Sequence, residues 1–248
     1  MKIVFILLYG LIGIVTSYFL VLLFFSLLVS PRKEYNKDSR LYRFLLHTAS
    51  VIVLRLMRVK VYVHGKEKLP SDQKLLFVCN HRSNFDPIIT WYIFRDHKLA
   101  FISKKENFKL PIFGRIIRKC CFMAIDRESP KKAIATINRA SKLLESQEVS
   151  IGVYPEGKRS KDGVLSKFHS GVFRIAQKAH APLAILSING TEKIHKNYPF
   201  RSSRVDISVV DVISTEQTCS TRTNDLCNIS KKMIENNLKQ KLDNKDSK

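Results

Sequence analysis

The stretch from Leu75 to Asp86 constrains the fold most, because an unbroken apolar run in it passes directly into polar residues. Residues 75–79 show no alternation of apolar and polar side chains, which is typical of a strand buried on both faces of its sheet. Polar residues that include His81 follow this run, and Asp86 and Pro87 open the next apolar segment. An imidazole and a carboxylate at the end of a buried strand make this stretch the first candidate for a functional site.

Short apolar segments alternate with helical patterns along the rest of the chain. Strands are expected at residues 59–64, 75–79, 99–103, 122–125, 150–154, 183–188 and 205–213. Helices are expected at residues 87–94, 171–180 and 226–242, and another begins at Pro130 with Ile134, Ile137, Ala140 and Leu144 on one face. This alternation predicts an α/β fold with a mainly parallel central sheet flanked by helices, in a domain covering residues 59–248.

The amino-terminal residues 3–30 contain no charged side chain and are mostly Leu, Ile, Val and Phe. As a helix this stretch is about 40 Å long, more than the ~30 Å hydrocarbon core of a bilayer. A signal peptide is the competing interpretation, but its apolar region would be too long and no small-x-small cleavage site follows. We therefore predict a retained membrane helix, which either spans the bilayer or lies along it.

Basic residues near this helix predict its orientation. Only Lys2 precedes the apolar stretch, whereas Arg32, Lys33, Lys37, Arg40 and Arg43 follow it. The positive-inside bias places the remainder of the chain on the cytoplasmic side of the inner or cytoplasmic membrane. Residues 41–57 form a second helical segment, whose charges favour a helix in the membrane interface or one packed on the first helix. The pattern of residues 41–57 is equally compatible with an amphipathic helix that packs on the domain at residues 59–248. Residues 1–58 as a whole are assigned to membrane anchoring.

The charge of the chain points to an anionic partner. It has 43 Lys and Arg against 21 Asp and Glu, a net charge of +22, which suits nucleic acid, a membrane surface or a phosphate-bearing substrate. Residues 103–119 are rich in Lys and Arg, with Phe108, Ile112 and Phe113 interleaved. That mixture favours anionic lipid, and a membrane anchor argues against nucleic acid. The five cysteines show neither metal-ligand spacing nor a disulfide framework, which favours a reducing compartment.

His81 and Asp86 can meet only in one local arrangement. On a single helix they would lie about 140° apart, so His81 must be in the loop and Asp86 in the first helical turn, with Ser83 or Asn84 as N-cap. Asp86 would then fix the tautomer of the imidazole and leave its other nitrogen as a base. The spacing Ser83-x-x-Asp86 is also close to a capping box, with Asp86 only a cap partner. The spacing alone leaves both interpretations open.

Two other chemistries have weaker support in this stretch. Ser83 as a nucleophile with His81 as its base would need a geometry that residues two apart rarely reach. A metal site on His81 and Asp86 has no third ligand nearby, so no metal is expected. Farther along, residues 154–160 form a turn after a strand, in which Gly157 permits a tight bend and Arg159 is suited to bind a phosphate.

Together these stretches resemble the glycerolipid acyltransferase family that includes 1-acylglycerol-3-phosphate acyltransferases. The resemblance covers about residues 59–191 and departs from the family pattern at Tyr154 in place of Phe, Lys158 in place of Thr, and Ile185 in place of a second Pro. Its blocks are NHxSxxD at residues 80–86, Lys104 and Lys105 followed by Pro-x-x-Gly at 111–114, Phe-x-x-Ile-Asp-Arg at 122–127, the Pro-Glu-Gly turn at 154–160, and a Pro-containing strand at 181–188.

The resemblance implies transfer of a fatty acyl group from acyl-CoA or acyl carrier protein to the sn-2 hydroxyl of lysophosphatidic acid. It implies His81 as the general base and Asp86 as the residue that orients it, with membrane lipids as partners and no cofactor. Alternatives are the same chemistry on a lysophospholipid, glycerol-3-phosphate or a lyso-aminolipid, and a non-catalytic protein that binds anionic lipid. The resemblance assigns the acceptor phosphate to Lys104, Lys105, Arg127 and Arg159, and the shaping of the site to Asn80, Ser83, Glu156 and Gly157.

Overall fold

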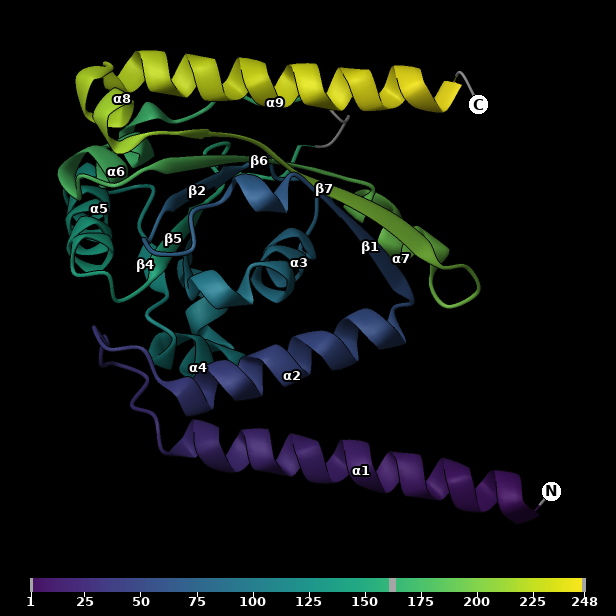
Figure 1. The fold of residues 1–248 in the computed structure, drawn as a ribbon. Helices are drawn as coiled ribbons and strands as arrows, with labels where there is room; N and C mark the ends of the chain where they lie inside the picture. Colours follow the sequence, from purple (N-terminus) through teal and green to yellow (C-terminus); the bar gives the residue numbers. More distant parts are fainter. Residues whose placement is uncertain (1, 161–163, 247–248) are drawn as a thin grey trace.

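The computed structural model describes residues 2–160 and 164–246, which fold around a central β-sheet (Figure 1). Its seven strands match the predicted segments to within two residues at each end. They run in the spatial order β1-β7-β6-β2-β5-β3-β4. Their bounds are β1 (Val59–His64), β2 (Leu76–Cys79), β3 (Leu99–Lys104), β4 (Met123–Ile125), β5 (Ser150–Val153), β6 (Leu183–Asn189) and β7 (Ser203–Ile213).

The sheet is mainly parallel, as predicted. Only the β6–β7 pair is antiparallel, while β1 pairs parallel with β7 at the sheet edge. β2 lies between β5 and β6, and all of its residues are buried. The prediction from the unbroken apolar run at residues 75–79 is therefore confirmed, because both faces of the strand are covered.

Helices cover both faces of this sheet (Figure 1). α9 (Thr223–Asp246) lies across β6 and β7, and α3 (Asp86–Ile93) lies on the opposite side. The predicted helix at residues 171–180 is a 3₁₀ turn at Ser170–Phe173 followed by α6 (Arg174–Lys178). α5 (Pro130–Glu145) begins where predicted, and the helices too short to show a period are α4 (Phe113–Lys119), α7 (Ile194–Asn197) and α8 (Thr215–Ser220).

Two helices precede the sheet and lie side by side at the bottom of Figure 1. α1 (Lys2–Leu27) and α2 (Arg40–Leu56) are joined where the Tyr42 hydroxyl donates to the Phe25 carbonyl at 2.9 Å. α2 buries Leu46 and Leu54 in the same core as the sheet and leaves Phe44 exposed. Within the described residues, no helix combines the length and the apolar character that crossing a membrane requires.

The parallel strands bring several chain segments to one edge of the sheet. β2, β3, β4, β5 and β6 run in the same direction, so the residues that follow their carboxyl ends gather there. In open α/β sheets this edge is where ligands bind. His81 follows β2, Tyr154 follows β5, and Thr191 follows β6 by two residues. Because β7 runs the other way, its first residue, Ser203, starts at this same edge.

Candidate functional site

The structure brings His81 and Asp86 together at the end of β2. Nδ1 of His81 lies 2.8 Å from Oδ2 of Asp86. The His81 side chain is 19 % exposed, whereas that of Asp86 is completely buried. The condition derived from the sequence is met, since His81 lies in the loop and Asp86 is the first residue of α3. The helix is capped at Phe85, however, and not at Ser83 or Asn84, because α3 begins only at Asp86.

Asp86 also holds the loop that carries His81. Its Oδ2 accepts from the backbone N–H of Arg82 at 2.6 Å and from that of Ser83 at 2.7 Å. The second bond is one half of a capping box. The other half is missing, because the Ser83 hydroxyl accepts from the N–H of Phe85 at 3.3 Å. The cap interpretation and the dyad interpretation therefore describe the same carboxylate, which fixes both the loop backbone and the imidazole.

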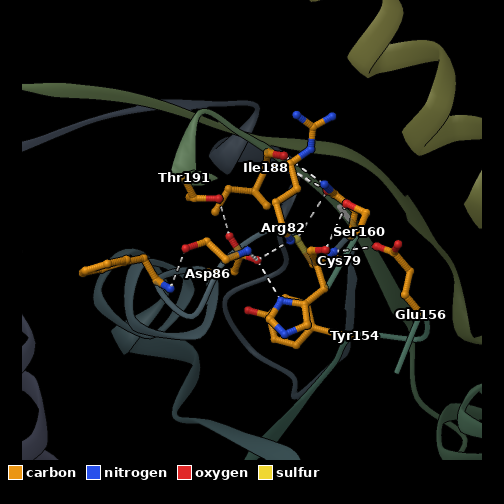
Figure 2. Close-up of polar contacts among 12 residues, drawn as sticks. Cys79, Arg82, Asp86, Tyr154, Glu156, Ser160, Ile188 and Thr191 are labelled. Carbon is orange, nitrogen blue, oxygen red and sulfur yellow. Dashed lines mark hydrogen bonds and ion pairs between the residues drawn. The ribbon is translucent and has the colours of Figure 1, made fainter. Parts of the chain in front are cut away.

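Thr191 completes the set of donors around Asp86 (Figure 2). Its hydroxyl donates to Oδ1 of Asp86 at 2.6 Å, and both residues are buried. Thr191 follows Gly190, whose φ of +91° and closeness to the Arg204 carbonyl leave no room for a side chain. Sequence reasoning did not find Thr191. The available signal was the change from apolar to polar residues at the carboxyl end of β6.

This arrangement prepares one nitrogen of the imidazole for proton transfer. With Nδ1–H donating to the carboxylate, Nε2 is the atom that can accept a proton. The ring packs against Tyr154, with centroids 4.6 Å apart. Burial, together with the nearby Cys79 and Asp86, raises the pKa of the Tyr154 phenol well above its usual range, and burial likewise raises the pKa of the Cys79 thiol. Both groups stay protonated at neutral pH, so neither supplies an anionic nucleophile beside His81.

The turn at residues 154–160 binds the backbone of His81 from the neighbouring strand. Glu156 is buried, and its Oε1 accepts from the N–H of His81 at 2.7 Å while its Oε2 accepts from the N–H of Ser166 at 2.9 Å. The N–H of Ser160 donates to the carbonyl of His81 at 2.9 Å. Gly157 adopts the left-handed conformation, with φ +67°, that this turn requires. The sequence predicted that Glu156 only shapes the turn, whereas in the structure its carboxylate also binds the backbone of His81.

Asn80 fixes the end of β2 to β6. Its Nδ2 donates to the Ile188 carbonyl at 2.9 Å, and its Oδ1 accepts from the N–H of Ile188 at 2.8 Å. Because Asn80 is completely buried, both groups need these partners. The pair of bonds sets where the loop leaves the sheet, immediately before His81.

The four predicted phosphate ligands lie at the same edge of the sheet, but none contacts His81. Nζ of Lys105 lies 2.9 Å from Oδ2 of Asp126, and this hydrogen bond lowers the pKa of Asp126. Lys104, Arg127 and Arg159 are exposed. In the part of the chain that the structure describes, no hydrogen bond or ion pair involves the side chains of these three residues.

Two alternative chemistries can be compared with this geometry. Ser83 is buried, and within residues 2–160 and 164–246 its hydroxyl makes no hydrogen bond to His81. A Ser83 nucleophile therefore lacks its base. Across the same described residues, no group of three or more His, Cys, Asp or Glu side chains is arranged to hold a metal ion.

Comparison with known proteins places the chain in a family. The family model described as Acyltransferase matches residues 60–189. The 1-acyl-sn-glycerol-3-phosphate acyltransferase of Limnanthes douglasii is 25% identical over 163 residues, which are 66% of this chain and 57% of that protein. The protein of the same name from Streptococcus pneumoniae is 25% identical over 194 residues, 74% of this chain and 70% of its own length.

A solved structure shares the fold. The 1-acyl-sn-glycerophosphate (LPA) acyltransferase PlsC from Thermotoga maritima superimposes with a TM-score of 0.70 at 22% identity, over 90% of this chain and 88% of that one. The chain spans little more than half the length of the plant relatives that it matches. The family model nevertheless covers more than half of this chain, and it includes the whole stretch that holds His81, Asp86 and Glu156. This chain therefore belongs to the acyltransferase family.

Proposed function

We propose that the protein transfers a fatty acyl group from an acyl thioester to the sn-2 hydroxyl of lysophosphatidic acid, giving phosphatidic acid. The observation that carries this proposal is the 2.8 Å contact between Nδ1 of His81 and the buried carboxylate of Asp86. It leaves Nε2 as a base on a partly exposed imidazole. The names of the relatives from Limnanthes douglasii and Streptococcus pneumoniae support this choice of acceptor.

In the proposed reaction His81 acts as general base. The acceptor hydroxyl gives its proton to Nε2 while its oxygen attacks the thioester carbonyl carbon. A carbon–oxygen bond forms, the carbon–sulfur bond breaks, and the proton passes from the imidazolium to the leaving thiolate. Asp86 stabilises the imidazolium between these steps and keeps the ring in one orientation. The scheme needs no covalent acyl-enzyme.

The acceptor phosphate is assigned to Arg159, Arg127 and Lys104. These side chains are exposed at the edge of the sheet that holds His81. Lys105 is the weaker candidate, because its ammonium group already pairs with Asp126 at 2.9 Å. Arg159 immediately precedes Ser160, whose N–H donates to the His81 carbonyl. A phosphate held there would lie on the same turn that fixes the base.

A panel of acceptors tests the proposal. The purified protein is given acyl-CoA or acyl carrier protein thioesters together with lysophosphatidic acid, glycerol-3-phosphate, lysophosphatidylglycerol or a lyso-aminolipid. We expect phosphatidic acid as the main product, measured by mass spectrometry. A higher kcat/KM with another acceptor would keep the chemistry and replace the substrate. Transfer to none of them would favour a non-catalytic protein that binds anionic lipid.

Replacing Arg159 by alanine tests the phosphate assignment. Loss of a charge-assisted hydrogen bond costs about 1.5–3 kcal/mol, so KM for lysophosphatidic acid should rise about tenfold or more. KM for the acyl donor should stay unchanged. Arg222→Ala removes an exposed arginine from the opposite edge of the sheet and serves as the matched control. Equal KM values in the two variants would remove Arg159 from the site.

We propose that residues 1–58 attach the protein to the cytoplasmic side of the inner or cytoplasmic membrane. Large apolar side chains are exposed along α1 and on the outer side of α2, among them Phe5, Phe19, Phe24 and Phe44. Burying such a surface in the membrane interface would stabilise the bound state. The vesicles that carry the lysophosphatidic acid also test this attachment, because the protein should float with them on a density gradient.

A further inference from the structure

An exposed aromatic loop joins α7 to β7. This 198–201 loop consists of Tyr198, Pro199, Phe200 and Arg201. Phe200 is 86% exposed, more than any other large hydrophobic side chain that the structure describes, and Tyr198 is 47% exposed. Two neighbouring aromatic side chains left in water on one short loop need a reason, because single exposed apolar residues are common but clusters mark contact sites.

The loop is held in a defined conformation by its backbone contacts. Nη1 of Arg58 donates to the carbonyls of Pro199 and Phe200 at 3.2 and 3.3 Å. The N–H of Arg201 donates to the carbonyl of Asn197 at 2.7 Å. The Asn197 side chain in turn donates to the Ser203 hydroxyl at 3.0 Å. The aromatic side chains are therefore presented by an ordered turn that is bonded at both ends.

The charges around the loop are basic. Arg201 lies in the loop, Lys196 precedes it, and Arg58 is bonded to its carbonyls; all three are exposed. Exposed Phe and Tyr with Lys and Arg around them match the headgroup region of an anionic membrane. Phe, Tyr and Arg are also enriched in protein–protein interfaces. The membrane is chosen as the occupant because α1, with its exposed apolar side chains, points its amino-terminal end toward the same side of the molecule (Figure 1).

The loop follows closely, along the chain, a residue that contacts the dyad. It belongs to the segment that begins with Thr191, which donates to Asp86, and the ring of His195 packs on Phe85 with centroids 5.0 Å apart. In Figure 1 the loop between α7 and β7 lies on the side where α2 ends and toward which the amino-terminal end of α1 points. The N–H of Ser203 donates to the Arg58 carbonyl at 3.1 Å, which joins the start of β7 to the short connection between α2 and β1.

From these observations we infer that the 198–201 loop is a second membrane contact, which places Phe200 and Tyr198 in the interface of an anionic bilayer beside the site. The contact is separate from α1 and α2 and would hold the His81 edge of the sheet against the surface that supplies the lipid acceptor. The inference rests on the proposed function only for this last purpose. Its test needs no turnover.

Phe200→Trp in the full-length protein reports on the loop directly. The chain has a single tryptophan, Trp91, which is 3% exposed and gives a constant background. With vesicles of phosphatidylglycerol and brominated phosphatidylcholine, we expect the new emission to shift to shorter wavelength and to be quenched severalfold. Ile229→Trp is the matched control, because Ile229 is 40% exposed near the start of α9, which follows the carboxyl end of β7 at the opposite edge of the sheet. Its emission should not change.

The charge of the loop is tested in the Phe200→Trp background. Each cation near an anionic surface contributes about fivefold to partitioning. Lys196→Ala and Arg201→Ala should therefore each lower the ratio of immersed to free loop about fivefold with phosphatidylglycerol, and have little effect with phosphatidylcholine alone.

Two results would overturn the inference. One is quenching of Phe200→Trp no greater than that of Ile229→Trp in vesicles that the protein has bound, as shown by flotation. The other is a blue shift that grows with protein concentration without lipid, which would identify a second copy of the chain as the occupant. Failure of wild-type protein to acylate lysophosphatidic acid would instead refute the proposed function and leave the quenching result unaffected.

Discussion

Replacing His81 by alanine should lower kcat/KM for acyl transfer to lysophosphatidic acid by about 10²- to 10⁴-fold, the usual contribution of a general base. No other described side chain replaces Nε2 at this position, since the Tyr154 phenol and the Cys79 thiol are kept protonated by burial. The loss should fall mainly on kcat, because in the proposed reaction the imidazole acts on the acceptor hydroxyl as it attacks. Initial rates at saturating concentrations of both substrates measure it.

The fold should tolerate this substitution. The His81 side chain is 19% exposed, and the contacts of Glu156 and Ser160 are to its backbone, which alanine retains. His81→Ala should therefore still unfold cooperatively and float with vesicles, with its melting temperature lowered only by the lost Nδ1–Asp86 bond, because Asp86 keeps the N–H donors of Arg82 and Ser83. His180→Ala, at an exposed histidine beside Cys219 and before the amino end of β6, at the sheet edge opposite His81, is the matched control. Full activity of His81→Ala would exclude it as the base.

The alternative chemistry, hydrolysis of the acyl donor through Ser83, can be tested separately. That chemistry predicts a covalent acyl-enzyme and free fatty acid when the acyl donor is added without an acceptor. Intact-mass measurement of the wild type under these conditions should show no added acyl group, because the Ser83 hydroxyl is buried and bonded to the N–H of Phe85. A mass increase that Ser83→Ala abolishes would replace the proposed mechanism.

Local sequence was enough to predict the part of the site that local geometry determines. The run at residues 75–79 required a strand covered on both faces, and Pro87 required a helix start just before it. Together they place His81 in a loop and Asp86 in the first turn, where Nδ1 and Oδ2 are 2.8 Å apart. The start of α5 follows from Pro130 for the same reason, with the Ser129 side chain as its cap.

Contacts between distant segments could not be predicted in this way. Thr191 is 105 residues from Asp86, and Glu156 is 75 residues from His81. These contacts depend on the order of strands in the sheet, which periodicity does not contain. The pairing of Lys105 with Asp126 is similar, because it follows from the register that sets Lys104 beside Ile125. α4 was not predicted, because a helix of about two turns is too short to show a helical period, and its Lys and Arg residues suggested only a basic surface.

Replacing Asp86 by asparagine should reduce kcat by about 10²- to 10⁴-fold while the chain still folds. In a Ser-His-Asp triad the corresponding change lowers kcat about 10⁴-fold. The retained oxygen should face His81, Arg82 and Ser83, because an amide NH₂ would repel their N–H donors. The new NH₂ then faces the Thr191 hydroxyl, which can accept. The loop geometry survives, and only the negative charge that stabilises the imidazolium is lost.

The Asp86→Asn variant separates the two interpretations of this carboxylate. If Asp86 were only a helix cap, kcat would be kept and the free energy of unfolding would fall by about 1–3 kcal/mol, as for buried hydrogen bonds. Thr191→Val, which removes one donor and keeps the charge, should lower kcat far less. If Asp86 acts through His81, as proposed, adding Asp86→Asn to His81→Ala should cause little further loss. Losses that multiply in the double variant would mean that the carboxylate contributes to catalysis without the imidazole, and the dyad would have to be abandoned.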